Sequence, residues 1–327
     1  MSEAPDDAVL RVINPGALAT LQDRGRMGYQ RYGVPQSGAM DAWTFAIACM
    51  LVGNDLNEAA IEFTLIGGTY GVESGACRAA VAGAFPVTLN GAAVPSYRAF
   101  DLQAGDTLRI GAGNIPGGSA RGYLAIAGGF DVAPVLGSRS THVRSGIGGI
   151  DGAALRKDAR LRLRAPAAQG GPPQALDPRL ARHDPGAIRV LRGPQDDYFD
   201  AKGWGVLLEE TWRMSPQSDR MGMRLEGPRL PHKGDYNIVS DGVPHGAIQV
   251  PGDGTPIVLL ADRQSTGGYP KIATAISADL PRLGQLRPGD SLRFARVTID
   301  EAEAAVRELA GRIELLRSAL RPAGILA

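Results

Sequence analysis

Glycine and proline occur throughout this chain and divide its apolar residues into short runs. The 327 residues include 44 glycines and 23 prolines, about a fifth of the chain. Both residues favour turns, and short apolar runs between turns are typical of β-strands. Asn90-Gly91 is the clearest turn signal, because a type I′ hairpin needs positive φ at both central positions. The sequence therefore predicts a mainly β protein with some α-helix.

Two segments depart from this pattern and predict helices. Residues 42–51 are apolar and follow Asp41, whose carboxylate can cap a helix N-terminus. Near the C-terminus, Thr298 and Glu301 match a T-x-x-E capping box. Apolar residues then follow at alternating spacings of four and three: Ala302, Val306, Leu309, Ile313, Leu316 and Leu320. Such a stripe must be buried, either on its own domain, the simpler interpretation, or against another subunit.

The length of the chain allows two domains, each with its own core. Residues 165–187 lack apolar periodicity and are rich in proline, glycine and alanine, which is typical of a linker. We therefore expect an N-terminal β-rich lobe at 8–164 and a C-terminal β-rich lobe at 188–297. A helix over 298–321 would follow.

A short internal similarity suggests that the two lobes are related. Residues 102–109 (LQAGDTLR) resemble residues 286–293 (LRPGDSLR), and each places a Gly-Asp turn before a strand. A duplicated β unit is one explanation of this match.

Charge and cysteine content limit the possible functions. Lys and Arg (35) nearly balance Asp and Glu (34), so the net charge of +1 gives no long-range attraction for nucleic acid or anionic membranes. No apolar run approaches the length of a membrane span, and residues 1–7 are unlike a signal peptide. Cys49 and Cys77 are expected to be buried free thiols. We expect a soluble, cytoplasmic protein.

Several catalytic motifs are absent from the sequence. It contains no P-loop, no complete dinucleotide-binding fingerprint, no H-E-x-x-H and no G-x-S-x-G. The four histidines show no metal-ligand spacing, so we expect no metal site. A biotin-attachment Met-Lys-Met is also missing, so biotin chemistry would need a carrier on another chain.

The first candidate site lies in the loop between residues 22 and 41. Arg24 and Arg26 flank Gly25, so their guanidinium groups could converge on an anion approached by the backbone. Alternatively, these arginines pair with Asp23 and Asp41 and hold the loop in place. A glycine- and hydroxyl-rich segment at 137–149 could likewise bind phosphate or carboxylate, or be a plain loop.

The second candidate site combines residues 241–250 with residues 256–271. If 245–250 form a strand, His245 and Gln249 share one face, because side chains alternate along a strand. The return strand would bring Asp262 and Gln264 close to His245. This combination suits a small polar carbonyl or carboxylate substrate, with His245 or Asp262 moving protons. The alternative is a hydrogen-bond network that braces a tight hairpin.

Four sequence blocks together resemble one family. They are QDRGRMGY at 22–29, VPQSGAMD at 34–41, SDRMG at 218–222 and DRQSTGGYP at 262–270. Taken in this order they resemble the biotin-dependent carboxyltransferase family. That family includes KipA-like proteins, the allophanate hydrolase subunit 2 domain and the C-type subunit of 5-oxoprolinase. The resemblance extends from about residue 12 to residue 294.

The resemblance implies cyclophilin-like β-barrel lobes plus a C-terminal helix. It also implies a hydrolase subunit, inactive alone, that joins a B-type (KipI-like) subunit and an A-type subunit. The complex would bind ATP and hydrolyse 5-oxo-L-proline to L-glutamate. Two alternatives remain: a carboxyltransferase component of a urea-type carboxylase, with biotin on another chain, or a non-catalytic KipA-like regulatory protein.

The site residues follow from the second candidate segment and from the family blocks. The catalytic candidates are His245, Asp262 and Gln264. The substrate-binding candidates are Arg24, Arg26, Ser37, Gln249, Thr266, Tyr269 and Lys271. Both lactam hydrolysis and carboxyl transfer to urea polarise an amide-like carbonyl, so this set suits either reaction.

Overall fold

The computed structural model describes residues 8–113, 119–164 and 171–323. Residues 1–7, which are unlike a signal peptide, and 165–170, the start of the expected linker, lie outside the described residues. The chain forms two compact units. The first holds Met1–Arg26, Ser37–Arg182 and Glu314–Ala327; the second holds Met27–Gln36 and His183–Ile313.

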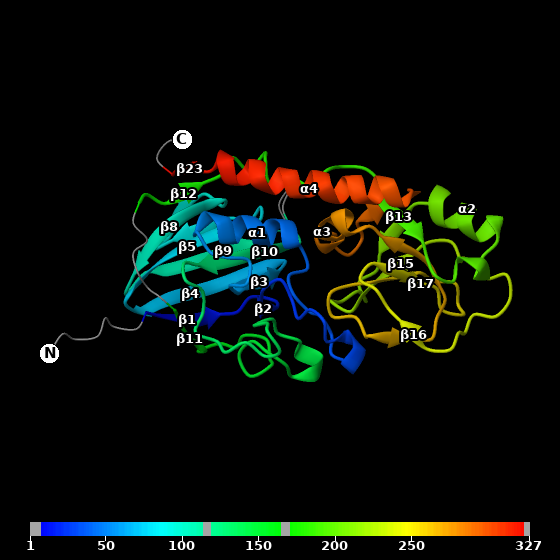
Figure 1. The fold of residues 1–327 in the computed structure, drawn as a ribbon. Coiled ribbons are helices and arrows are strands. Elements are labelled where there is room, and N and C mark those ends of the chain that lie inside the picture. Colours follow the sequence, from blue (N-terminus) through cyan, green and yellow to red (C-terminus); the bar gives the residue numbers. More distant parts are fainter. Residues whose placement is uncertain (1–7, 114–118, 165–170, 324–327) are drawn as a thin grey trace. The chain divides into compact units, whose positions relative to one another are not determined.

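Two antiparallel sheets build the first unit (Figure 1). The six-stranded sheet has the order β11 (Arg160–Arg162), β1 (Val9–Asn14), β4 (Ile66–Ser74), β9 (Thr107–Ala112), β6 (Val87–Leu89) and β7 (Ala92–Val94). The seven-stranded sheet has the order β2 (Ala19–Gln22), β3 (Ala60–Thr64), β10 (Arg121–Ile126), β5 (Ala76–Ala82), β8 (Arg98–Gln103), β12 (Gln174–Ala175) and β23 (Arg321–Pro322). One 3₁₀ turn, η2 (Val143–Ser145), also belongs to this unit.

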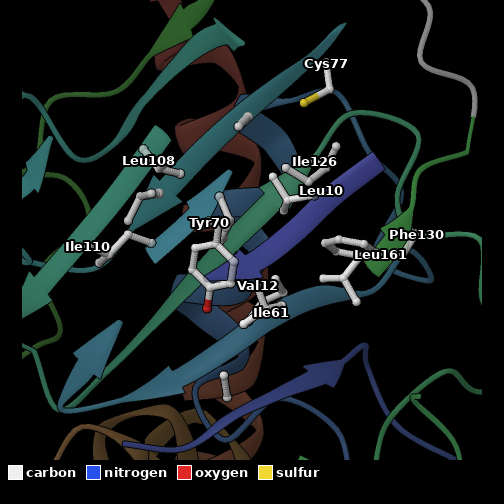
Figure 2. Close-up of a cluster of buried hydrophobic side chains, with 14 of the residues drawn as sticks. Leu10, Val12, Ile61, Tyr70, Cys77, Leu108, Ile110, Ile126, Phe130 and Leu161 are labelled. Carbon is white, nitrogen blue, oxygen red and sulfur yellow. The ribbon is translucent and has the colours of Figure 1, made fainter. Parts of the chain in front are cut away.

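The apolar core of the first unit takes side chains from both sheets (Figure 2). Leu10 and Val12 of β1 point inward together because alternate strand residues share a face. Ile61 of β3 and Ile126 of β10 come from the other sheet. The hydroxyl of Tyr70 is satisfied inside this core, since it donates to the carbonyl of Gly67 at 2.9 Å.

Two local predictions for this unit are confirmed. The β6–β7 hairpin turns at Asn90 and Gly91, with φ of 51° and 84°. Both cysteines are buried free thiols, and burial raises the pKa of Cys49 and of Cys77 to about 12.

The predicted N-terminal helix is α1 (Ala42–Leu51), which packs on β10 and β5. Asp41 caps it as expected, because its Oδ1 accepts the N–H groups of Trp43 and Thr44 at 3.0 Å each. Every residue from Trp43 to Leu51 is buried. The helix is therefore part of the core.

The second unit is built on an eight-stranded sheet. Its order is β21 (Ser291–Leu292), β14 (Trp212–Met214), β15 (Gly222–Glu226), β18 (Ile257–Leu259), β17 (Ala247–Gln249), β20 (Lys271–Ala275), β13 (Ile188–Arg192) and β22 (Phe294–Arg296). The edge strands β21 and β22 are separated in sequence by Arg293 alone, so the sheet curls into a nearly closed barrel. The prediction of a mainly β, barrel-like fold with a C-terminal helix is confirmed.

Smaller elements complete the second unit. They are a two-stranded sheet of β16 (Asp241–Gly242) and β19 (Thr266–Gly267), the helices α2 (Ala201–Glu209) and α3 (Leu280–Gly284), and the 3₁₀ turns η1 (Gln30–Tyr32), η3 (Asp196–Tyr198) and η4 (Ser277–Asp279).

The two Gly-Asp segments adopt the same local turn, one in each unit. Asp106 accepts the N–H of Gln103 at 2.8 Å, and Asp290 accepts the N–H of Arg287 at 2.9 Å. The preceding glycines have φ of 94° and 91°, values that favour glycine. This agreement supports the interpretation that the segments are related.

The C-terminal helix is α4 (Ile299–Ala319), and its capping box forms as predicted. Glu301 accepts the N–H of Thr298 at 2.7 Å, while Thr298 Oγ1 accepts the N–H of Glu301 at 3.3 Å. No helix in the described part of the chain is both long and apolar enough to cross a lipid bilayer.

The predicted apolar stripe of α4 is only partly right. Ala302 and Leu316 are buried, but Val306 is 44% exposed and Ala305 is buried in its place. A straight α-helix has 3.6 residues per turn, so a regular four-three repeat drifts off the buried face. Ala302 and Ala305 pack with Ile276 of their own unit, which favours the simpler interpretation for this part of the stripe.

The described part of the expected linker is structured and belongs to the first unit up to Arg182. Ala175 of β12 pairs with Arg98 of β8, and the carbonyl of Ala181 accepts the indole N–H of Trp43 at 2.8 Å.

Candidate functional site

The second unit brings residues 241–250 and 257–271 side by side. Strand β17 pairs with β18, placing Ile248 opposite Val258, and with β20, placing Gln249 opposite Lys271. The small sheet pairs Gly242 of β16 with Thr266 of β19. The predicted return of the chain beside β17 is therefore present.

His245 lies outside the strand, unlike the expectation that it would share a strand face with Gln249. Strand β17 begins at Ala247, and Gly246 has a φ of 84°, which interrupts the extended backbone. The N–H of Ala247 donates to the carbonyl of Pro244 at 3.2 Å and closes a turn around His245. Local alternation could not reveal this turn.

Gln249 and Gln264 form an amide pair. Nε2 of Gln264 donates to Oε1 of Gln249 at 3.5 Å, and Nε2 of Gln249 donates to the carbonyl of Tyr269 at 3.4 Å. Gly267 leaves room for this pair, because a Cβ atom there would lie 2.6 Å from Nε2 of Gln249. The structure thus brings together three of the predicted residues, with Tyr269 contributing its backbone.

Lys271 is fully buried and holds a second polar group together. Its ammonium donates to Oδ2 of Asp241 at 3.1 Å, and the side chain of Gln195 donates to the same oxygen at 3.2 Å. The hydrogen bond from Lys271 is the main cause of a lowered pKa for Asp241. The ammonium of Lys271 is therefore already paired with a carboxylate.

Asp262 is also engaged in an ion pair. Its two carboxylate oxygens accept Nε and Nη2 of Arg220 at 2.8 and 3.1 Å, and both side chains are buried. Such a fork-to-fork pair fixes both groups and favours the ionised carboxylate. Its geometry suits a structural role better than proton transfer.

Arg263 and His245 share an electropositive environment. The guanidinium of Arg263 donates to the carbonyls of Val243 and Leu260. It is also buried, and this burial lowers the pKa of Arg263 to about 10. Burial, then the positive charges of Arg263 and Arg220, lower the pKa of His245 to about 3. His245 is therefore neutral near pH 7 and is a weak base.

An open cavity of about 520 Å³ adjoins these groups in the second unit. Its lining combines hydroxyl, amide, guanidinium and backbone groups: Gln30, Arg31, Gly33, Gly242, Val243, Pro244, Ser265 and Thr266. A Cβ atom at Gly267 would lie 3.3 Å from Val243 as well as close to the amide pair. Gln249 and Gln264 do not line the cavity themselves, but Gly267, which follows the lining residue Thr266, lies next to both the amide pair and Val243.

A second cleft of about 590 Å³ contains none of the predicted residues. Its lining combines the apolar Leu208, Leu292 and Phe294 with the polar Thr211, Ser291 and Arg293. The first cavity is the better candidate because the predicted residue Thr266 lines it and the amide pair lies next to it.

The three predicted N-terminal site residues belong to the first unit. Arg24 is exposed. Arg26 is fully buried, and its Nε and Nη2 donate to the carbonyls of Val135 and Ser140 at 3.0 and 2.7 Å. Ser37 is buried and donates to the carbonyl of Thr141 at 3.3 Å. The observed contacts of Arg26 and Ser37 hold the loop rather than face a cavity.

The hydroxyl-rich segment at 137–149 surrounds a carboxylate from the protein itself. Ser138 and Ser140 donate to Oδ1 of Asp23 at 2.7 and 2.5 Å, and the N–H of Arg139 donates to Oδ2 at 2.6 Å. The segment therefore binds a carboxylate, as its composition allowed, but an internal one.

Sequence reasoning missed several residues of the cavity region. Gln30 and Arg31 line the cavity, and Gln195 binds Asp241. Arg31 belongs to the same candidate loop as Arg24 and Arg26, but only those two flank a glycine, so only those two were predicted. Gln195 stands in no recognisable pattern. In the described part of the chain, no group of three His, Cys, Asp or Glu side chains is placed to hold a metal ion.

Residues 32–296 match the carboxyltransferase domain family, subdomain A and B. This chain belongs to that family. Its similarity to the C-type subunit of 5-oxoprolinase from Escherichia coli is 37% identity, covering 90% of this chain and 93% of that protein. Urea amidolyase of Saccharomyces cerevisiae is 32% identical over 91% of this chain, although this covers only 17% of that enzyme.

A solved structure supports the same relationship for this carboxyltransferase-family chain. The crystal structure of the K. lactis urea amidolyase superposes on this chain with a TM-score of 0.88 at 30% sequence identity. The match covers 96% of this chain and 20% of that one. The chain therefore corresponds in fold to one part of a much longer enzyme.

Proposed function

We propose that this chain is the C-type subunit of an ATP-dependent 5-oxoprolinase, which hydrolyses 5-oxo-L-proline to L-glutamate. The similarity to the C-type 5-oxoprolinase subunits of Escherichia coli and Haemophilus influenzae supports this, since each match covers 93% of the relative's length. The structural observation that carries the proposal is the polar cavity with the amide pair of Gln249 and Gln264 next to its lining residues.

The cavity region offers hydrogen-bond donors to an amide carbonyl. Opening an unstrained lactam requires polarisation of its carbonyl oxygen, which preorganised donors stabilise as negative charge develops. We infer that the hydroxyl of Thr266, which lines the cavity, and the amide of Gln264, which lies next to it, act as such donors. His245 is neutral and Asp262 is ion-paired, so we infer that this subunit binds and polarises the lactam rather than supplying a strong base.

ATP would activate the lactam at the level of the complex. In the usual picture the γ-phosphoryl group moves to the amide oxygen, water adds to the carbonyl carbon, and the C–N bond breaks with a proton going to the ring nitrogen. This gives an acyl phosphate, which a second water hydrolyses to the carboxylate and phosphate. The chain lacks a P-loop, so we propose that a B-type (KipI-like) or an A-type subunit takes part in nucleotide binding. A cytoplasmic location is part of this proposal, and the buried free thiols fit it.

The proposal is tested by reconstitution. The chain is co-expressed with its B-type and A-type partners, and ATP-dependent release of glutamate from 5-oxo-L-proline is measured. We expect release only with all three subunits and ATP. A complete, assembled complex that releases no glutamate would exclude this function.

A second candidate is carboxyl transfer to urea. The 32% identity to a urea amidolyase favours it, and so does the TM-score of 0.88 to another. Because the chain has no biotin-attachment sequence, this reaction needs a carrier on another chain. Transfer of label from carboxylated carrier to urea would support the second candidate over the first.

A further inference from the structure

Arg31 is the one ionisable side chain among the eight residues that line the cavity of the second unit. It is exposed, and its guanidinium carbon lies 4.8 Å from the centre of the Tyr32 ring. A guanidinium over an aromatic face is held by a cation–π interaction, which leaves its N–H groups available to a ligand. In the described part of the chain no carboxylate lies within ion-pair distance of Arg31.

Arg263 adds a second positive charge to the same wall. It is 2% exposed, and its Nε donates to the carbonyl of Val243, a cavity-lining residue, at 3.0 Å. Its remaining contacts are the carbonyl of Leu260 at 3.3 Å and Oε1 of Gln36 at 3.5 Å. Buried charges in proteins are normally paired with an opposite charge. Among the described residues, no carboxylate pairs with Arg263.

The neighbouring charges do not cancel this excess. Arg220 is neutralised by Asp262, and Lys271 is neutralised by Asp241. Arg31 and Arg263 are thus the two cations of this wall that no described carboxylate neutralises. An anionic group in the cavity would therefore meet a site with unbalanced positive charge and with hydroxyl donors on Ser265 and Thr266.

We propose that Arg31, with the charge of Arg263 behind it, binds the carboxylate of the substrate. This inference rests on the proposed function, because 5-oxo-L-proline is a small lactam that carries a carboxylate. Urea is neutral and carries no carboxylate for Arg31 to pair with. Arg31 would therefore set the specificity of the cavity for an anionic lactam.

The test measures KM and kcat for 5-oxo-L-proline in the complete complex with Arg31→Gln, Arg31→Lys or Arg213→Gln. Arg213 is an exposed arginine on β14, outside the cavity, and serves as the control. Loss of a charge-assisted hydrogen bond should raise KM about tenfold or more in Arg31→Gln, with a smaller change in kcat. Arg31→Lys should recover part of the affinity, and Arg213→Gln should match the wild type.

Different results would exclude the proposed function and the proposed carboxylate site at Arg31. A wild-type complex that releases no glutamate removes the proposed function. An active wild-type complex in which Arg31→Gln leaves KM unchanged, or lowers kcat alone, overturns the carboxylate site and leaves the function standing. An equal rise of KM in Arg213→Gln would also overturn it, because the effect would then be general electrostatics.

Discussion

The carboxylate of Asp262 accepts two hydrogen bonds from Arg220, at 2.8 and 3.1 Å, and both side chains are buried. Sequence position alone made Asp262 a candidate for proton transfer. The pair instead links residues 42 positions apart in the chain, before β15 and after β18. Its geometry therefore favours a structural role for Asp262.

Removing this carboxylate should destabilise the protein. Asp262→Asn removes the carboxylate that pairs with the buried guanidinium of Arg220, so we expect the free energy of unfolding to fall by about 3 kcal/mol. Urea denaturation measures the change. The control is Asp158→Asn, which removes the partner of Arg11 in an ion pair that is about half exposed and should matter little. Equal losses in the two variants would contradict a structural role for Asp262.

The amide pair should depend on Gly267. In Gly267→Ala the new Cβ atom would lie 2.6 Å from Nε2 of Gln249, so the pair must move. We expect glutamate release by the complete complex to fall about tenfold, a loss of the size caused by removing one oriented donor. Gly268→Ala is the matched control, since its nearest neighbour would be 3.4 Å away. Similar rates in both variants would show that the amide pair is not needed.

The sequence predicted those features of the fold and site that depend on residues close together in the chain. Asp41 and the Thr298–Glu301 box were predicted correctly because each side chain satisfies backbone groups within one helical turn. His245 was placed wrongly on the strand because Gly246 turns the backbone. The cavity wall joins residues 30–33 to residues 242–244, and no local pattern reveals a pairing across two hundred positions.

Acid should reveal the neutral state of His245. Its pKa is about 3 in the folded chain but near 6.5 when unfolded, so below pH 6.5 only the unfolded chain takes up this proton. Stability therefore falls as pH decreases from 6.5, by up to about 1.4 kcal/mol per pH unit. His245→Asn lacks this contribution. Unfolding free energies measured from pH 7 to about pH 5 should show a shallower loss in the variant. Parallel curves would mean that His245 takes up its proton as readily in the folded chain as in the unfolded one.

Helix α4 offers two adjacent leucines with opposite exposure. Leu316 is 4% exposed and Leu315 is 67% exposed. Leu316→Asp would bury a charge, so we expect poor solubility or a thermal midpoint well below that of the wild type. Leu315→Asp should fold normally. If Leu315→Asp folds but fails to assemble with the A-type and B-type partners, the exposed face of α4 is an interface with them. Normal folding of Leu316→Asp would show that the buried stripe contributes little.

The most direct test of the account is glutamate release by the complete complex carrying Gln264→Ala. Gln103→Ala, at an exposed position on β8, is the control. If the amide of Gln264 polarises the lactam carbonyl, its loss should lower kcat/KM for 5-oxo-L-proline at least about tenfold while the complex still assembles. His245→Ala should also lower the rate. Wild-type kcat/KM in an assembled Gln264→Ala complex would contradict the central claim that this site binds the lactam and polarises its carbonyl.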